Sequence, residues 1–116
     1  MGMDLYMIPV KPEEVGDRKT DTPVVIERIN TAHTCWTWRR DRELFGFMKE
    51  LYHRKGGGGR DFNNPDNVVV DEDDLDQLVL RLAREGENDM PHVEEEVRTM
   101  RAELRDGYRL VFIPSY

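Results

Sequence analysis

Short apolar runs near both ends of the chain flank a middle region with helical stripes of apolar residues. Met3–Val10 is predicted to be a strand that the prolines at its end terminate. The charged, proline-containing stretch 11–23 is predicted to be a loop. The β-branched segment Val24–Ile29 then predicts a second strand. Thr31–Trp38 fits either the continuation of a hairpin or the approach to a helix, and its pattern does not separate the two.

Two stretches in the middle of the chain carry apolar residues at the spacing of an amphipathic helix. The first helix is predicted to start at the capping residue Asp41. It ends at the glycine run 56–59, which has too much backbone freedom to stay helical. The second is predicted to start at Asp71, which three acidic residues follow in the first turn, where the helix dipole favours negative charge. Gly86 is predicted to end this helix.

A third helix is predicted from near Pro91 to Gly107. Val68–Val70 is a short strand or an extended lead-in to the second helix, and Tyr108–Ile113 predicts a final strand. Strands near both ends with helices between them predict an α+β fold, a small mixed or antiparallel sheet with about three helices packed on it. With 116 residues, the chain has room for a single domain, 1–116.

Charge is distributed unevenly along the chain, which carries a net charge of −7. Residues 36–60 hold seven basic and three acidic side chains, whereas residues 61–106 hold fifteen acidic and five basic ones. A protein with this balance repels bare nucleic acid and anionic membranes at long range. The molecule therefore has a basic segment and a strongly acidic half.

Several features of the sequence predict a cytoplasmic protein. The single cysteine, Cys35, cannot form an internal disulfide. The N-terminal residues lack the basic region and apolar core of a signal peptide. No apolar run approaches the roughly 20 residues that a membrane span needs.

Motifs for catalysis, metal binding or cofactor binding are not recognisable in the sequence. His33 and Cys35 form one close pair, whereas zinc sites use four ligands that usually come in close pairs. The acidic stretch 71–76 lacks the glycine that an EF-hand loop requires at its sixth position. The glycine run 56–59 follows a helix and lacks the Lys-Ser or Lys-Thr of a phosphate-binding loop, so it is predicted to be mobile. We therefore expect a protein without catalytic residues, metal or cofactor.

Carboxylates on the second and third helices are the first candidate for a partner-binding surface. A short connection favours antiparallel packing of these helices, which would gather the carboxylates into one anionic patch. Such a patch would suit a basic nucleic-acid-binding groove of another protein. Helix capping and solubility are the simpler explanation of the same residues. The candidate residues are Asp71, Glu72, Asp73, Asp74, Asp76, Glu94, Glu95 and Glu96.

A second candidate is a nucleic-acid-binding surface in the basic segment. Aromatic and basic side chains together can stack bases and contact phosphates. In the alternative explanation, the tryptophans belong to the core and the arginines to a solvated surface. The candidate residues are Trp36, Trp38, Arg39, Arg40, Arg42 and Arg60.

The opening Met1–Met7 reads Met-Gly-Met-Asp-Leu-Tyr-Met. It resembles the opening Met-Gly-Leu-Asp-Met-Tyr-Leu of a family of uncharacterised phage and prophage proteins. The family's Trp-Arg-Lys entry into a helix is similar to Trp38–Arg40, and its Tyr-Tyr-Val-Ser-x-Glu-Asp-Leu helix entry is similar to Val69–Leu75. Members end in an aromatic strand with Ser and Trp, which Ser115–Tyr116 resembles.

The resemblance implies a small phage-encoded accessory protein without an enzymatic activity to carry over. Such proteins include inhibitors of host defences, among them anti-CRISPR proteins. The expected partner is then a host defence protein or ribonucleoprotein complex in the host cytoplasm.

Overall fold

The computed structural model describes residues 2–116 and confirms the predicted α+β fold. The elements in chain order are β1 (Asp4–Val10), α1 (Pro12–Val15), the 3-10 helix η1 (Ile26–Thr31), β2 (Trp36–Arg39), α2 (Arg42–Arg54), β3 (Val68–Val70), α3 (Glu72–Arg84), α4 (Met90–Arg105) and β4 (Arg109–Ser115). Within this part of the chain, no helix is both long enough and apolar enough to span a membrane.

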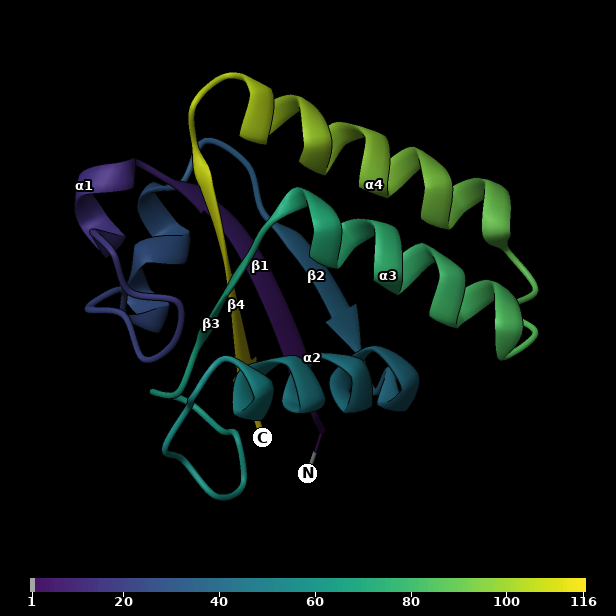
Figure 1. The fold of residues 1–116 in the computed structure, drawn as a ribbon, viewed down its shortest axis with the longest axis horizontal. Coiled ribbons are helices and arrows are strands. Elements are labelled where there is room, and N and C mark those ends of the chain that lie inside the picture. The colour runs from purple at the N-terminus through teal and green to yellow at the C-terminus, as the bar shows by residue number, and fades with distance from the viewer. Residues whose placement is uncertain (1) are drawn as a thin grey trace.

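The four strands form one antiparallel sheet in the order β2-β1-β4-β3. The first and last strands pair along their full length, from Asp4 opposite Ser115 to Val10 opposite Arg109. The start of β1 therefore lies beside the end of β4 (Figure 1).

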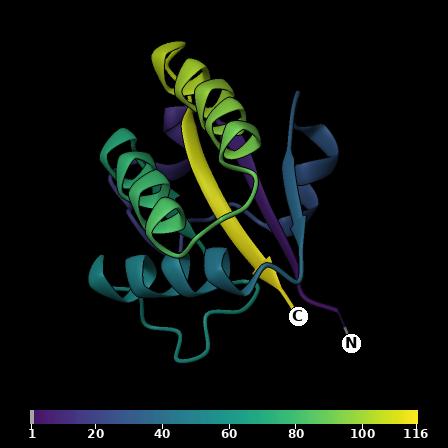
Figure 2. The ribbon, with the colours of Figure 1, turned by 90° about the vertical axis from the view of Figure 1, so that its right-hand side faces the viewer.

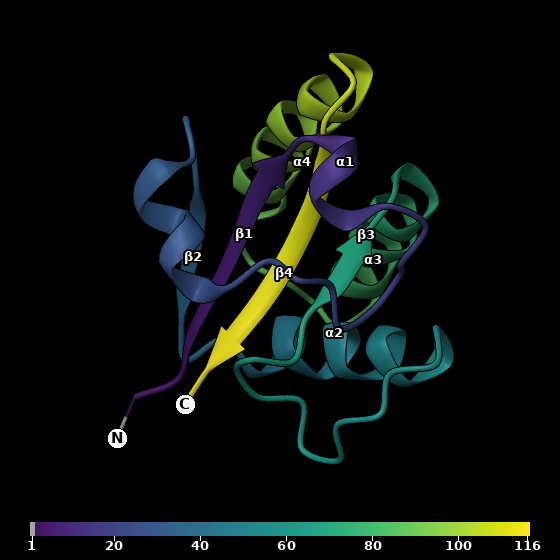
Figure 3. The ribbon, with the colours of Figure 1, turned by 90° about the vertical axis from the view of Figure 1, so that its left-hand side faces the viewer.

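Helices α2, α3 and α4 cover one face of the sheet, while α1 and η1 cover the other (Figures 2 and 3). Because side chains alternate along a strand, each central strand contributes to both layers. Leu5 of β1 and Phe112 of β4 point into the core under the three long helices. Ile8 and Val111 point into the smaller core under α1 and η1. Both faces of the sheet are thus buried, which explains the continuous apolar runs of the terminal strands.

The predicted strand Val24–Ile29 is wrong, because this segment leads into η1 and the strand follows at 36–39. Val24, Ile26 and Ile29 pack against the second face of the sheet. These side chains are therefore covered although the segment is not a strand. Tertiary packing has overridden β-propensity here.

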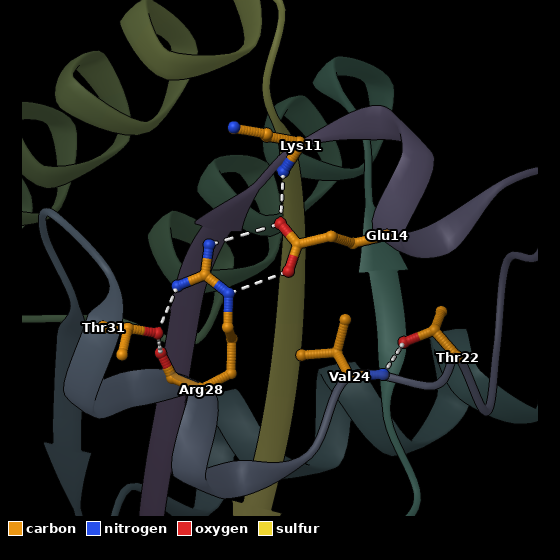
Figure 4. A network of polar contacts seen from close by, with 6 residues as sticks. All are labelled: Lys11, Glu14, Thr22, Val24, Arg28 and Thr31. Atoms are coloured by element: carbon orange, nitrogen blue, oxygen red, sulfur yellow. Dashed lines mark hydrogen bonds and ion pairs between the residues drawn. The ribbon is translucent and has the colours of Figure 1, made fainter.

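The predicted loop 11–23 contains the one-turn helix α1, which an ion pair joins to η1 (Figure 4). The Glu14 carboxylate accepts hydrogen bonds from Nε and Nη2 of Arg28 at 2.8 and 3.2 Å, and from the backbone N–H of Lys11 at 2.8 Å. The guanidinium of Arg28 holds the pKa of Glu14 below its ordinary value. The ion pair between Glu14 and Arg28 therefore joins the two short helices into one layer over the sheet.

The predicted starts and ends of the long helices are confirmed. The side chains of Asp41 and Asp71 accept hydrogen bonds from the third residue beyond them and cap α2 and α3. Asp89, one residue before the start of α4, caps that helix. The turns after α3 and α4 take positive φ angles at Gly86 (80°) and Gly107 (97°), which glycine adopts without steric cost.

Candidate partner-binding surface

The eight predicted carboxylates do not form one patch, so this part of the prediction is wrong. Helices α3 and α4 pack antiparallel, and the start of α3 lies beside the end of α4 (Figure 1). The contact between Glu72 and Arg105 marks this end of the pair. The carboxylates of 71–76 therefore lie at one end of the two helices, and those of 94–96 lie toward the other.

Arginines of α4 also pair with several of these carboxylates. Arg101 pairs with Asp76 across the helix interface, and Arg105 lies 3.7 Å from Glu72. Arg98 pairs with Glu95 on the same helix. The arginines lie toward the C-terminal end of α4, where the negative end of the helix dipole favours positive charge. Their spacing also places them on the side of α4 next to α3. The surface of the helix pair is therefore a mixture of both charges.

Asp71 and Asp74 are tied into the start of α3. Asp71 accepts a hydrogen bond from the backbone of Asp74, and the Asp74 carboxylate accepts one from the backbone of Asp71 at 2.9 Å each. Lys55, at the end of α2, donates to the Asp74 carboxylate and to the carbonyl oxygen of Val69 at 2.7 Å. These acids fix one helix to the next, whereas Asp73 and Glu94 are exposed.

Trp36 and Trp38 face α4 and not the arginines of the basic segment. The indole N–H of Trp36 donates to Thr99 Oγ1 at 3.1 Å, and that of Trp38 donates to Glu96 Oε1 at 3.4 Å. Arg39 projects from the opposite face of the strand and lies 3.4 Å from Asp4. The tryptophans and Arg39 therefore lie on opposite faces of β2 and do not form the predicted aromatic and basic surface.

A cavity of about 320 Å³ lies beneath Trp38, at the end of the molecule where α2 and α4 start and α3 ends. Its floor is apolar, and its rim is polar. The lining residues are Thr37, Trp38, Asp41, Leu44, Leu78, Leu82, Glu87, Asp89, His92, Val93, Glu96, Val97 and Met100. Figure 2 faces this end, with the α3–α4 connection in front.

The ionisable groups that line this cavity are carboxylates and one imidazole, without lysine or arginine among them. Asp41 and Asp89 cap the starts of α2 and α4, so the positive ends of two helix dipoles offset part of their charge. Glu96 lies 3.6 Å from Nε2 of His92. Glu87 is exposed and accepts a hydrogen bond from the backbone of Asp89 at 3.1 Å. The remaining charge is negative.

A smaller cavity of about 200 Å³ adjoins the first and shares Leu82 and Glu87 with it. It adds two further carboxylates, of which Glu85 lies 3.5 Å from Arg81. We call the carboxylates of both cavities the acidic end: Asp41, Glu43, Glu85, Glu87, Asp89 and Glu96. By contrast, the α2–α3 groove and the α3–α4 groove each contain three arginines. Of the acidic end, sequence reasoning named Glu96 alone, because the other five sit at the starts and ends of three different helices.

The histidines and the cysteine take part in separate contacts. His33 Nε2 lies 2.9 Å from Glu103 Oε1, and its ring lies 4.9 Å from the ring of Tyr108. Cys35 Sγ lies 3.6 Å from the backbone oxygen of Trp36. Among residues 2–116, no three His, Cys, Asp or Glu side chains are grouped as metal ligands would be.

The glycine run, predicted to be mobile, is packed against the buried ring of Tyr52. The Tyr52 hydroxyl donates to the Asp21 carboxylate, with oxygen separations of 2.8 and 2.9 Å, and accepts from the N–H of Gly59 at 2.6 Å. The N–H of Gly58 donates to Asp21 at 3.3 Å. These hydrogen bonds tie the loop to Tyr52 and Asp21, contacts that the sequence did not predict.

We expect Tyr52 to ionise later than an ordinary tyrosine. Burial first, and then the Asp21 carboxylate, raise the pKa of Tyr52 to about 12. Because the pKa of Tyr52 is higher in the folded than in the unfolded state, the neutral hydroxyl stabilises the folded protein below pH 10. This contribution to the free energy of unfolding is lost as the pH rises from 10 toward 12. A titration of absorbance at 295 nm should show a late component that Tyr52→Phe removes, while Tyr116, whose pKa burial also raises, stays in the curve. An unchanged titration curve in that variant would contradict the assignment.

No family model, curated protein or solved structure matches this chain. The arrangement of side chains at the acidic end is therefore the main guide to function.

Proposed function

We propose that this protein binds a basic segment of a partner protein at its acidic end. The observation that carries the proposal is the cavity beneath Trp38, where carboxylates surround an apolar floor without a lining lysine or arginine. Lysine and arginine side chains combine an apolar stem with a cationic head, and both parts find a counterpart there. The half-buried indole of Trp38 adds a surface for a cation–π contact.

The partner that this proposal favours is a host defence protein or ribonucleoprotein complex. The support for this choice is the likeness of the opening Met1–Met7 to phage accessory proteins. In this proposal the protein is an inhibitor of the anti-CRISPR type, and it acts in the host cytoplasm by occupying a basic nucleic-acid-binding surface. In this proposal the contact is made by the acidic end, which shares only Glu96 with the eight carboxylates predicted on α3 and α4.

Binding can be measured with Trp38 as the reporter. The chain has two tryptophans, so Trp36→Phe leaves the indole beside the cavity as the single fluorophore. A lysine- and arginine-rich peptide should change its fluorescence with an affinity that falls steeply as salt is added, whereas a peptide of reversed charge should not. A response that is indifferent to salt and to peptide charge would contradict the proposal.

Charge removal at the acidic end should weaken this binding by about tenfold or more. The variant Glu87→Gln, Asp89→Asn and Glu96→Gln keeps the hydrogen-bond acceptors for the backbone of residue 89, the start of α4 and Trp38. Its matched control, at the far end of α3, is Glu72→Gln, Asp73→Asn and Asp76→Asn, which removes the same charge. We expect the control to bind nearly as the parent does. Equal losses in both variants would mean that net charge alone attracts the peptide.

A further inference from the structure

A cavity of about 590 Å³ lies at the end of the sheet where β1 starts and where β2 and β4 end. Its lining residues are Gly2, Met3, Arg40, Arg42 and Tyr116. Figure 3 shows the start of β1 and the end of β4 at this side of the sheet. The volume lies within the range of small-molecule sites, which runs from roughly 300 to 1,000 Å³.

The turn between β2 and α2 contributes basic side chains to this cavity and an acidic side chain to the cavity beneath Trp38. Arg40 and Arg42 line the present cavity, whereas Asp41 lines the acidic one and caps α2. Arg39, which precedes them, has its charge matched by Asp4 at 3.4 Å. Among the ion pairs of residues 2–116, neither Arg40 nor Arg42 has a carboxylate within 4.0 Å. The two guanidinium groups are therefore available to an anion.

Tyr116 supplies an aromatic surface that the surrounding chain holds in place. Its backbone N–H donates to Asn63 Oδ1 at 3.1 Å, and Asn63 Nδ2 donates to its carbonyl oxygen at 3.0 Å. Its hydroxyl donates to the carbonyl oxygen of Asp61, and its ring meets Phe45 at right angles with centroids 5.5 Å apart. The residue is nevertheless 47% exposed, so part of it remains open for contact.

We propose that this cavity binds a nucleotide unit, with its base against Tyr116 and its phosphate between Arg40 and Arg42. The planar guanidinium group matches phosphate geometry and forms paired hydrogen bonds with it. An aromatic side chain stacks on any base, since every base has a π-face. The unit is either a free nucleotide or one residue of a single strand. The site uses two arginines of the predicted nucleic-acid surface, but with Tyr116 in place of the tryptophans.

An NMR titration of the full chain tests this assignment. Adenosine 5′-monophosphate should shift the backbone signals of Gly2, Met3, Arg40 and Tyr116, while adenosine and inorganic phosphate bind at least tenfold more weakly. A hexamer of deoxyadenylate distinguishes the source of the unit. Much tighter binding of the hexamer indicates a single strand, and similar affinity indicates a free nucleotide. Adenosine binding as tightly as its phosphate would overturn the proposal.

Variants separate this site from general charge attraction. Arg40→Asn with Arg42→Gln should weaken binding of the monophosphate by about tenfold or more, and asparagine tolerates the positive φ of 58° at position 40. The charge-matched control is Arg84→Gln with Arg98→Gln, at exposed positions on α3 and α4. Tyr116→Leu should weaken nucleotide binding and leave phosphate binding unchanged. Equal effects of the first two variants, or an unaffected Tyr116→Leu, would overturn the assignment, with thermal melting confirming that each variant is folded.

Discussion

Lys55→Ala is expected to lower the free energy of unfolding by about 3 kcal/mol or more. The ammonium group at the end of α2 pairs with Asp74 in the first turn of α3, and their side chains are only 13% and 12% exposed. Removing the lysine leaves a carboxylate in a largely dry site, which costs far more than the loss of a surface ion pair. The carbonyl oxygen of Val69 loses a donor as well. Urea unfolding followed by circular dichroism measures the change.

Lys49→Ala is the control for this prediction, because it alters another half-buried lysine of α2 that forms no ion pair among the described residues. It should stay within about 0.5 kcal/mol of the wild type. Adding Asp74→Asn to Lys55→Ala should cost less than the sum of the two single changes, because the unpaired charge disappears with its partner. A loss below about 1 kcal/mol for Lys55→Ala would show that water reaches this pair and that the pair contributes little to joining α2 and α3.

The sequence predicted the long helices well because their limits depend on neighbouring residues. Asp41 and Asp71 cap helices through contacts three residues away, and Gly107 ends one through a local turn. The segment Val24–Ile29 failed because β-branched residues suit either a strand or any other surface packed on a sheet. A strand and a segment packed on the sheet are distinguished only by contacts between residues distant in sequence, such as the packing of Val24 on the second sheet face.

The candidate surface was less accessible to sequence reasoning than the fold. Whether Asp76 is free or paired depends on which residue of α4 lies opposite, and the packing of the two helices places Arg101 there. Helix periodicity gives the face of a residue but not its partner on another helix. The acidic end was missed for a related reason, since Asp41 and Glu96 are far apart in sequence and meet only after α2 and α4 pack together.

Gly57→Ala is expected to destabilise the protein by about 2 kcal/mol or more, although its neighbour Gly58 should accept alanine. A Cβ atom at position 57 would overlap three ring carbons of Tyr52. That ring has little room to move, because it stacks on Phe62 with centroids 4.5 Å apart and is anchored through its hydroxyl to Asp21. The added methyl group must therefore displace either the loop or a fully buried aromatic residue.

Gly58→Ala separates this crowding from the general effect of removing a glycine. A Cβ atom at position 58 meets nothing within 4 Å, and its φ lies outside the positive range. Alanine there restricts the unfolded chain and should change stability by no more than about 1 kcal/mol, in the stabilising direction. Thermal melting of both variants compares the two effects. A mobile glycine run would accept alanine equally at both positions, so a clear loss at 57 alone means that this loop is part of the packed core.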